Sequence, residues 1–391
     1  MGSIKDITRR ILYFFKRKPY KINLSNSLTS YSLCNSDNEY FYGYYDRSPE
    51  NNGLILYHEM LLDESAVRIT VMDIATKKRH VIAESKAYNW QMGSRAVWID
   101  NDTISYNDFD GRKYVCIWYS LKSKSTIRKF DLPLQDIRKK DFYLGVNYQR
   151  LRSYAKEYAY YCLPEMSEQE YEDYSNDGIW YMNTLSTQGS LLLSISDIMK
   201  CEPNSLFNVG KHFVNHVMIS PSGKGFIFIH RYYVKDKRYD RLMHYDFNSL
   251  KCLMDEPCQS HYCWLDDKTV FGYGEYEGKK GFYEIDVDSA NVKKHTALTL
   301  KHPRDGHPTV YHDWIVVDDY PDLSRMQALT AYNYKTNQII PLGEFFHDLR
   351  HKGINRCDLH PRFSDNGDFI YIDTIYSGHR CLLPLNIRLD Y

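Results

Sequence analysis

The chain has 391 residues, and its 50 lysines and arginines balance its 50 aspartates and glutamates. A neutral chain has no general attraction to nucleic acid, so we expect no nucleic-acid partner. Hydrophobic residues make up 43% of the chain and charged residues 26%, which excludes an extensively disordered protein. The 36 tyrosines favour β structure, because aromatic residues are enriched in strands.

The N-terminal segment, residues 1–22, holds seven basic residues and one acid. Apolar residues recur there at near-helical spacing, at Ile4, Ile7, Ile11, Phe14 and Phe15. This pattern predicts a short basic amphipathic helix, which can lie on an anionic membrane through residues 4–18 or pack on the main domain. No secretory signal is recognisable, and the nine cysteines are scattered. We expect a cytoplasmic protein with free thiols, either unattached or peripheral on the inner membrane face.

From residue 46 onward one pattern recurs: a polar anchor, an apolar run, a turn and a further strand. The anchors are Asp46, Ser94, Arg150, His216, His261, His307 and His360. They are 45 to 66 residues apart, a spacing typical of propeller blades. A lone four-stranded sheet cannot bury both faces, whereas radially packed blades can. We therefore predict an all-β fold in which residues 23–391 form a seven-bladed β-propeller, with residues 20–40 completing the last blade.

Histidines occupy four consecutive anchors, and 13 of the 15 histidines follow residue 206. The first strand of each propeller blade lines the axis, so these anchors are expected to meet at one mouth of the central channel. Four histidines in register indicate a functional cluster more than four separate structural roles. Other polar residues lie close by in sequence: Gln91, Tyr148, Arg150, Asn215, Arg231, Arg241, Arg356 and Asp358.

A mouth rich in histidine, arginine and tyrosine suits an acidic sugar. β-Elimination on a uronate needs a cation to neutralise the carboxylate and a base to remove the α-proton. Glycoside hydrolysis needs paired carboxylates, which are few near the anchors. The spacing Cys-x-x-His occurs at Cys258–His261 and Cys357–His360, but the two pairs fall in blades that are not neighbours. We therefore expect zinc less than manganese or calcium.

Several motifs together resemble the propeller-type polysaccharide lyases, such as oligogalacturonate lyase and the ulvan lyases. They are Asn215-His-Val-Met-Ile-Ser-Pro-Ser-Gly, Ser260-His-Tyr-Cys-Trp264, Asp305-Gly-His-Pro and Arg356-Cys-Asp-Leu-His-Pro-Arg362. The likeness extends to propeller proteins encoded with bacterial surface-polysaccharide genes, and it is clearest after residue 206. It implies cleavage of uronate-containing glycans by β-elimination.

The resemblance also implies roles for individual residues. Likeness to oligogalacturonate lyase makes His261 the base, Arg241 the substrate arginine, and His307 and His360 metal ligands. Likeness to the ulvan lyases instead gives proton transfer to His216 and Tyr148, with Arg231 on the carboxylate. The last blade of oligogalacturonate lyase supplies a glutamine and two histidines, where this chain has Asp358 and His360. That departure leaves both the metal and the sugar open.

We accordingly expect a lyase in which His216, His261, Tyr148 and Arg231 are catalytic. Substrate contacts are expected from Arg241, Gln91, Arg150, Arg356 and Asn215, and a divalent metal on His307, His360 and Asp358. Two rival functions remain. One is a non-catalytic propeller that binds a glycan or a partner in capsule or O-antigen biosynthesis. The other is an interaction scaffold with buried structural histidines.

Overall fold

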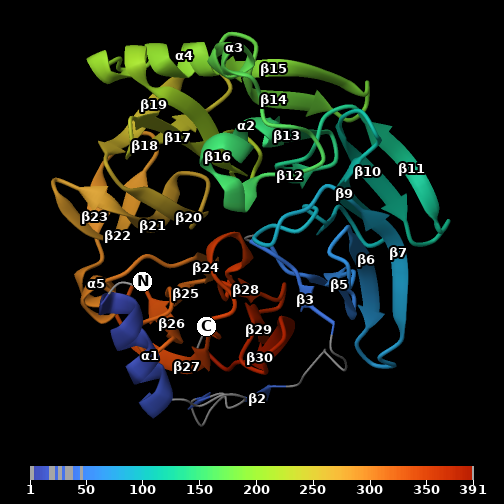
Figure 1. The fold of residues 1–391 in the computed structure, drawn as a ribbon, viewed down its shortest axis with the longest axis vertical. Helices are drawn as coiled ribbons and strands as arrows, with labels where there is room; N and C mark the ends of the chain where they lie inside the picture. The colour runs from blue at the N-terminus through green and yellow to red at the C-terminus, as the bar shows by residue number, and fades with distance from the viewer. Residues whose placement is uncertain (1–3, 17–22, 25–28, 31–37, 45–46, 390–391) are drawn as a thin grey trace. The chain divides into compact units, whose positions relative to one another are not determined.

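The computed structural model describes residues 4–16, 23–24, 29–30, 38–44 and 47–389. Over these residues the chain forms seven antiparallel sheets and is a seven-bladed β-propeller, as predicted (Figure 1). The chain groups into two compact units. The first unit comprises Met1–Ala83, Trp90–Gly93 and Ala297–Tyr391, and the second comprises Glu84–Asn89 and Ser94–Thr296.

The first unit contains three sheets. One sheet holds β3 (Tyr40–Phe41), β5 (Leu54–Met60), β6 (Val67–Asp73) and β7 (Arg79–Ser85), with β4 (Glu50–Asn51) paired to β5. The next holds β24 (Pro308–Tyr311), β25 (Trp314–Asp318), β26 (Met326–Asn333) and β27 (Ile339–Phe346). The third holds β28 (Arg362–Phe363), β29 (Phe369–Thr374) and β30 (Cys381–Asn386).

The second unit contains four sheets. The first sheet holds β8 (Val97–Trp98), β9 (Thr103–Phe109), β10 (Tyr114–Ser120) and β11 (Ser125–Phe130), and the second holds β12 (Asp136–Lys139), β13 (Phe142–Val146), β14 (Gly178–Asn183) and β15 (Gln188–Ser194). The third sheet holds β16 (Lys211–Ile219), β17 (Phe226–Val234), β18 (Lys237–Tyr245) and β19 (Leu250–Glu256). The fourth holds β20 (Gln259–Trp264), β21 (Thr269–Tyr276), β22 (Lys279–Asp286) and β23 (Val292–Lys294). In each sheet the strands follow one another in chain order, so each blade is an antiparallel meander.

Helices are short and connect or precede the blades. The α-helices are α1 (Ile4–Lys16), α2 (Tyr148–Tyr154), α3 (Glu168–Glu172), α4 (Ile195–Lys200) and α5 (Thr296–Lys301). Single 3-10 turns occupy Lys156–Tyr158, Ser205–Val209 and Gly353–Asn355. The predicted N-terminal helix is therefore present as α1, and residues 17–22 of the predicted basic segment lie outside the described residues. Among the described residues, no helix is long and apolar enough to cross a bilayer.

Two short N-terminal strands complete sheets that are otherwise built from the end of the chain. β1 (Asn23–Leu24) pairs with β27, and β2 (Thr29–Ser30) pairs with β30. The last blade thus takes its outer strand from the predicted closing segment, residues 20–40. This pairing satisfies the outer edge of β30, which would otherwise present unpaired backbone groups.

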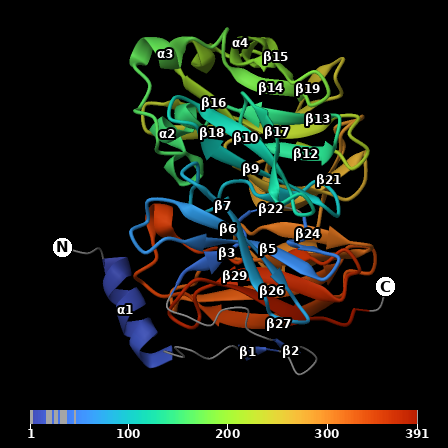
Figure 2. The ribbon, with the colours of Figure 1, turned by 90° about the vertical axis from the view of Figure 1, so that its right-hand side faces the viewer.

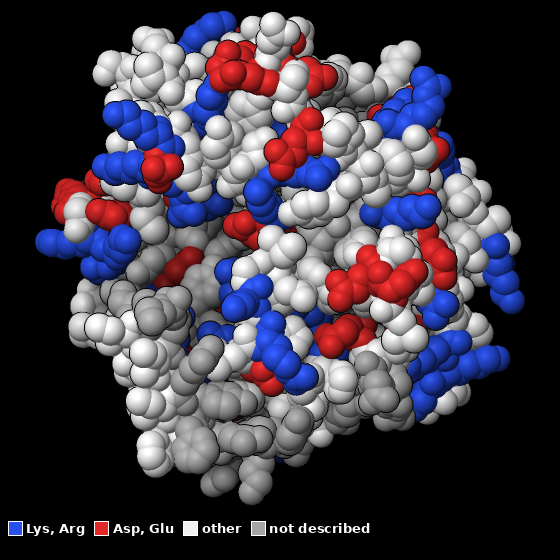
Figure 3. All heavy atoms as spheres, in the orientation of Figure 1, with Lys and Arg blue, Asp and Glu red and all other residues white. Residues whose placement is uncertain are grey.

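Neighbouring sheets within each unit bury a shared apolar layer. In the first unit, Trp314 and Leu329 pack in one cluster with Ile370 and Leu383 of the next sheet. Figure 2 labels β26 and β29, which belong to these two sheets. In the second unit, one cluster joins residues of β16–β19 to residues of β20–β23. At the surface, acidic and basic side chains are interspersed over the face drawn in Figure 3, as expected for a neutral composition.

Unusual backbone occurs at or beside the predicted anchor in three blades, before the first strand at Arg95 and His360 and within β16 at His216. Arg95, His216 and His360 have φ values of +54°, +50° and +43°, which lie in the left-handed region. Residues other than glycine occupy this region at a cost of about 1–3 kcal/mol, and such residues concentrate at functional sites. Thirteen other non-glycine residues of the described chain share this backbone region, whereas the anchors His261 and His307 do not, so the strain is local to His216 and His360 among the four histidine anchors.

Candidate active site

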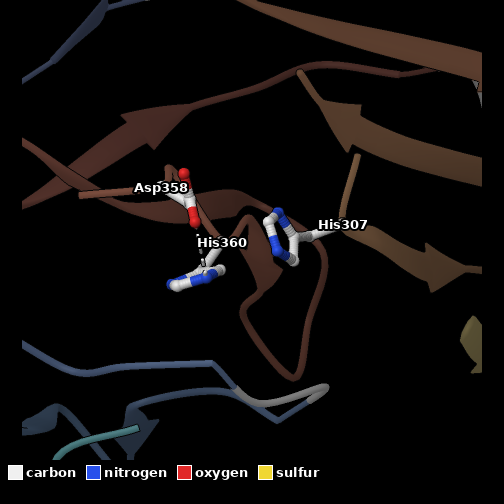
Figure 4. A group of neighbouring side chains, drawn as sticks. All are labelled: His307, Asp358 and His360. Atoms are coloured by element: carbon white, nitrogen blue, oxygen red, sulfur yellow. Dashed lines mark ion pairs between the residues drawn. The ribbon is translucent and has the colours of Figure 1, made fainter. Parts of the chain in front are cut away.

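A buried histidine and aspartate cluster lies in the first unit. His307 directly precedes β24, while Asp358 and His360 lie in the segment that leads to β28 (Figure 4). The two imidazole centroids are 4.4 Å apart, and one ligand atom from each of the three residues lies within 4.8 Å of the others. All three residues are at most 3% exposed. The structure thus brings together the three residues that the sequence predicts as metal ligands.

Asp318, at the end of β25, holds both histidines in place. One carboxylate oxygen accepts hydrogen bonds from the backbone N–H of His307 at 2.6 Å and from His307 Nδ1 at 2.9 Å. The other accepts from the backbone N–H of His360 at 3.0 Å. Gly306 permits this approach, since a Cβ atom at that position would lie 1.9 Å from the Asp318 carbonyl oxygen.

A second carboxylate, Asp373 on β29, lies 3.9 Å from Nδ1 of His360. Its own orientation is set by the backbone N–H groups of Tyr42 and Gly43, both at 2.9 Å, and by Arg362 at 3.2 Å. Each imidazole therefore faces a carboxylate on its Nδ1 side. This arrangement is the usual outer shell of metal-ligating histidines, because it directs Nε2 towards the ion.

Charge within the cluster is balanced. Burial opposes protonation of His307, but Asp318 outweighs it and raises the pKa of His307. Burial, and secondarily the charge of His307, lower the pKa of His360 to about 4. Burial would raise the pKa of Asp358, yet Arg356 and the two histidines hold it well below its ordinary value. The cluster therefore contains an ionised carboxylate and a neutral imidazole near pH 7.

Arg356 connects the cluster to the surface. Its Nε lies 2.7 Å from one oxygen of Asp358, its Nη2 lies 2.7 Å from the other, and its guanidinium stacks on Tyr320. The Arg356 side chain is 29% exposed, whereas that of Asp358 is 1% exposed. Among the arginines predicted to bind substrate, Arg356 is the one whose side chain is partly exposed, since those of Arg150 and Arg241 are 2% and 0% exposed.

Tyr44 and Gln91 lie beside this cluster. The Tyr44 ring is 5.4 Å from both imidazoles, and its backbone N–H donates to the Gln91 carbonyl. The Gln91 amide in turn donates to the Arg356 carbonyl at 2.8 Å. Gln91 therefore supports the loop that carries Arg356. The anchor Asp46, two residues after Tyr44, lies outside the described residues.

The other two predicted histidines meet in the second unit. The rings of His216 and His261 are 5.1 Å apart, and Tyr158 lies 4.9 Å from His216. Asn215 is 3% exposed, and within the described part of the chain its amide has no hydrogen-bond partner. A polar amide buried in this way costs free energy unless a ligand or water pairs with it. That all four histidines meet at one mouth of the central channel stays a prediction.

Tyr148, which was predicted to be catalytic, is fully buried, and that role stays a prediction. Its ring stacks on Tyr160 at 4.0 Å, and its hydroxyl lies 2.8 Å from both the Leu134 carbonyl and the Gln135 side-chain oxygen. Tyr158, ten residues further on, is the tyrosine that contacts His216. The helix α2, which begins at Tyr148, separates the two positions, and a strand pattern alone does not reveal it.

Three arginines of the second unit are buried: Arg150 and Arg241, which were predicted to contact substrate, and Arg231, which was predicted to be catalytic. Arg150 is paired with Asp177 and stacks on Tyr171, and Arg231 is paired with Asp240. Arg241 is fully buried and donates to the Cys201 carbonyl at 2.7 Å. Each guanidinium is therefore enclosed by protein groups, and the functional roles of these three arginines stay predictions.

Cysteine thiols do not extend the cluster. The eight cysteines that the structure describes form no disulfide, which matches the predicted free thiols. Burial raises the pKa of Cys357 to about 12, so this thiol is neutral. Among the described residues, the group of candidate ligand atoms comprises His307, Asp358 and His360 and includes no cysteine, and the identity of the metal stays a prediction.

The fold and the cluster define a class: a seven-bladed β-propeller with a buried His–Asp group at the start of its inner strands. Oligogalacturonate lyase from Vibrio parahaemolyticus has this fold, with a TM-score of 0.63 and 11% identity over 94% of this chain and 98% of that one. An oligogalacturonate lyase in complex with manganese aligns with a TM-score of 0.64 and 13% identity, over 94% and 97% of the two chains. The β-propeller domain of the trilobed protease from Pyrococcus furiosus aligns with a TM-score of 0.52 and 10% identity, over 90% and 99%. No protein-family model and no curated protein sequence matches the chain. At sequence identities this low, the structural similarity shows a common fold and nothing about function.

Proposed function

We propose that this protein is a lyase that cleaves a uronate-containing oligo- or polysaccharide by β-elimination. The observation that carries the proposal is the group of His307, Asp358 and His360 with Arg356 at its edge. The shared fold of two oligogalacturonate lyases, one of them in complex with manganese, supports the proposal at the level of architecture.

The cluster suits a divalent metal ion. His307 and His360 would supply imidazole nitrogens and Asp358 a carboxylate oxygen, and the carboxylates of Asp318 and Asp373 already support the two rings. Calcium binds through oxygen ligands, so two imidazoles favour manganese over calcium. Such an ion, when bound, neutralises a uronate carboxylate and makes the neighbouring proton more acidic.

Arg356 has the chemistry to bind the same carboxylate. Guanidinium groups bind carboxylates through two parallel hydrogen bonds, and an arginine already aligned by Asp358 loses little freedom on binding. The buried carboxylate of Asp358 thus positions the guanidinium, and the exposed part of the side chain can meet the substrate.

Proton transfer is assigned to histidine and tyrosine. His216 and His261 keep the roles that the sequence suggests, and Tyr158 replaces Tyr148 as the tyrosine beside His216 because its ring contacts the imidazole. Asn215 remains a proposed substrate contact. In the first unit, Tyr44 is a further candidate, since it lies against both imidazoles of the cluster.

A second candidate function is a non-catalytic propeller that binds an acidic glycan or a partner in surface-polysaccharide biosynthesis. The near-complete burial of His307, Asp358 and His360 favours it, because a buried group can organise Arg356 without entering a reaction. This function predicts glycan binding with no bond cleavage.

One experiment separates the two functions. The protein is incubated with oligogalacturonate and other uronate glycans, with and without manganese, and the ultraviolet absorbance of the unsaturated product is followed. Binding is measured in parallel by calorimetry. A lyase produces absorbance that falls by about 100-fold or more in Arg356→Ala, and only partly recovers in Arg356→Lys. His80→Ala, an exposed histidine on β7, is the matched control.

Further variants assign the proton-transfer residues. His216→Ala, His261→Ala, Tyr158→Phe and Tyr44→Phe are compared at saturating substrate, and Tyr148→Phe serves as the control for a buried tyrosine. Binding of a uronate glycan without any rise in absorbance would establish the second function and exclude the lyase. Neither binding nor absorbance on any uronate glycan would exclude both the lyase and a glycan-binding propeller.

A further inference from the structure

The N-terminal helix α1 exposes an apolar face. Ile4, Ile7, Ile11 and Phe15 are 84%, 54%, 51% and 79% exposed. At about 100° per residue, these four positions fall within an arc of about 80° on the helix. The apolar stripe of a helix in a globular protein normally faces the core. Ile4, Ile7 and Ile11 are instead more than half exposed, so these three side chains can meet another surface.

The charge of the same segment is strongly positive. The helix sequence contains Lys5, Arg9, Arg10 and Lys16 against the single acid Asp6. Three more basic residues follow by position 21 of the sequence. Because the whole chain has no net charge, this positive charge is a local feature of the N-terminal segment.

We propose that α1 is a membrane-surface helix that binds an anionic lipid bilayer. Ile4, Ile7 and Ile11 would enter the boundary between headgroups and acyl chains, and the basic residues would meet the negative surface. A binding groove on a protein would account for the apolar stripe alone, whereas an anionic bilayer accounts for the stripe and the charge together. With 13 residues, α1 is shorter than the roughly 20 that a spanning helix needs, so it would lie in the plane of the interface.

This proposal is independent of the reaction at the histidine cluster. It implies that the propeller works beside a membrane, where lipid-linked or surface-bound acidic ligands are concentrated. The failure of either proposal leaves the other intact, since vesicle binding and glycan cleavage are measured separately.

The test is flotation of the full chain with vesicles of phosphatidylcholine alone, or of phosphatidylcholine and phosphatidylglycerol in equal parts. We expect binding to the anionic vesicles, weak binding to the neutral ones, and release at high salt. Lys5→Gln with Arg10→Gln should weaken binding by about 30-fold, because each basic residue near the surface contributes about a kilocalorie per mole. Ile7→Ser with Ile11→Ser should weaken it by roughly 100-fold.

The matched control is Leu185→Ser with Leu300→Ser, which removes two apolar side chains that are 75% and 79% exposed elsewhere. This control should bind anionic vesicles like the unaltered chain. Circular dichroism and thermal unfolding verify that every variant folds. Equal binding to neutral and anionic vesicles, no binding to either, or unchanged binding of the isoleucine variant would overturn the proposal. The proposal would also be overturned if the unaltered chain does not bind vesicles and light scattering shows that replacing the isoleucines changes its oligomeric state.

Discussion

Replacing Asp318 with asparagine tests whether the outer carboxylate organises the histidine cluster. Asp318 accepts three hydrogen bonds, from two N–H groups of His307 and one of His360, at 2.6 to 3.0 Å. Asparagine keeps one acceptor oxygen and presents an NH₂ group to the remaining donor. One buried N–H therefore loses its partner and the others lose a charged acceptor, which costs about 2–4 kcal/mol of unfolding free energy. Manganese affinity should fall by about 10- to 100-fold.

Urea denaturation of the metal-free protein measures the first effect, and titration with manganese, followed by calorimetry and by its electron spin resonance signal, measures the second. Asp319→Asn is the matched control. Asp319 is a neighbouring buried carboxylate that accepts from Ala328 at 2.7 Å and from Arg304 at 2.6 Å. The Asp319→Asn variant should be less stable than the unaltered chain but should keep its manganese affinity. Equal manganese affinity in Asp318→Asn and the unaltered chain would refute the reasoning, and so would an equal loss of affinity in both variants.

Three further predictions follow from the same structure. Gly306→Ala places a Cβ 1.9 Å from the Asp318 carbonyl oxygen, so it should destabilise the fold by about 2–4 kcal/mol in urea and weaken manganese binding; an unchanged urea midpoint would contradict this. Burial lowers the pKa of His58 and of His212 to about 4 from the ordinary 6.5, so the unfolded chain binds protons that the folded chain does not. Stability is therefore full above pH 6.5 and is lost as the pH falls, by roughly 2 kcal/mol for each histidine at pH 5 in urea titrations; a flat profile would show these pKa directions to be wrong. Arg356→Ala should release Asp358 from its partner and lower uronate affinity by at least about tenfold in calorimetry, whether or not the protein is a lyase.

The architecture was predictable because each blade repeats its own local signals. Alternating apolar residues, polar turns and regular anchors appear in every blade, so the number of blades can be predicted even where one repeat is weak. The closing strand was also expected, since a ring of blades leaves an edge that an N-terminal segment can cover. α3 was less visible. It is a single short helix in an acidic stretch, and its one local signal is the capping box that Ser167 and Glu170 form at its start.

The candidate ligands His307, Asp358 and His360 were predicted from their position in the sequence repeat, because each blade places the start of its inner strand at the same point of the repeat. The side chains around them were not found. Asp318 is the last residue of β25 and Asp373 lies within β29, and an aspartate in a buried strand has no distinctive sequence signal. Tyr44 comes from a segment that is far away along the chain. The arginines show the converse: Arg150, Arg231 and Arg241 stand near the anchors in sequence, yet their guanidiniums are enclosed.

The amino-acid sequence by itself determined the fold class, the number of blades and the recurrence of histidines near the inner strands, because these depend on patterns within about fifty residues. Only the tertiary structure decided which carboxylate faces which imidazole, which arginine reaches solvent and which tyrosine touches His216. Those relations join residues that are far apart along the chain, and their distances follow from how twisted sheets pack against one another. Packing of this kind depends on the shapes of many side chains together, and no short stretch of sequence contains it.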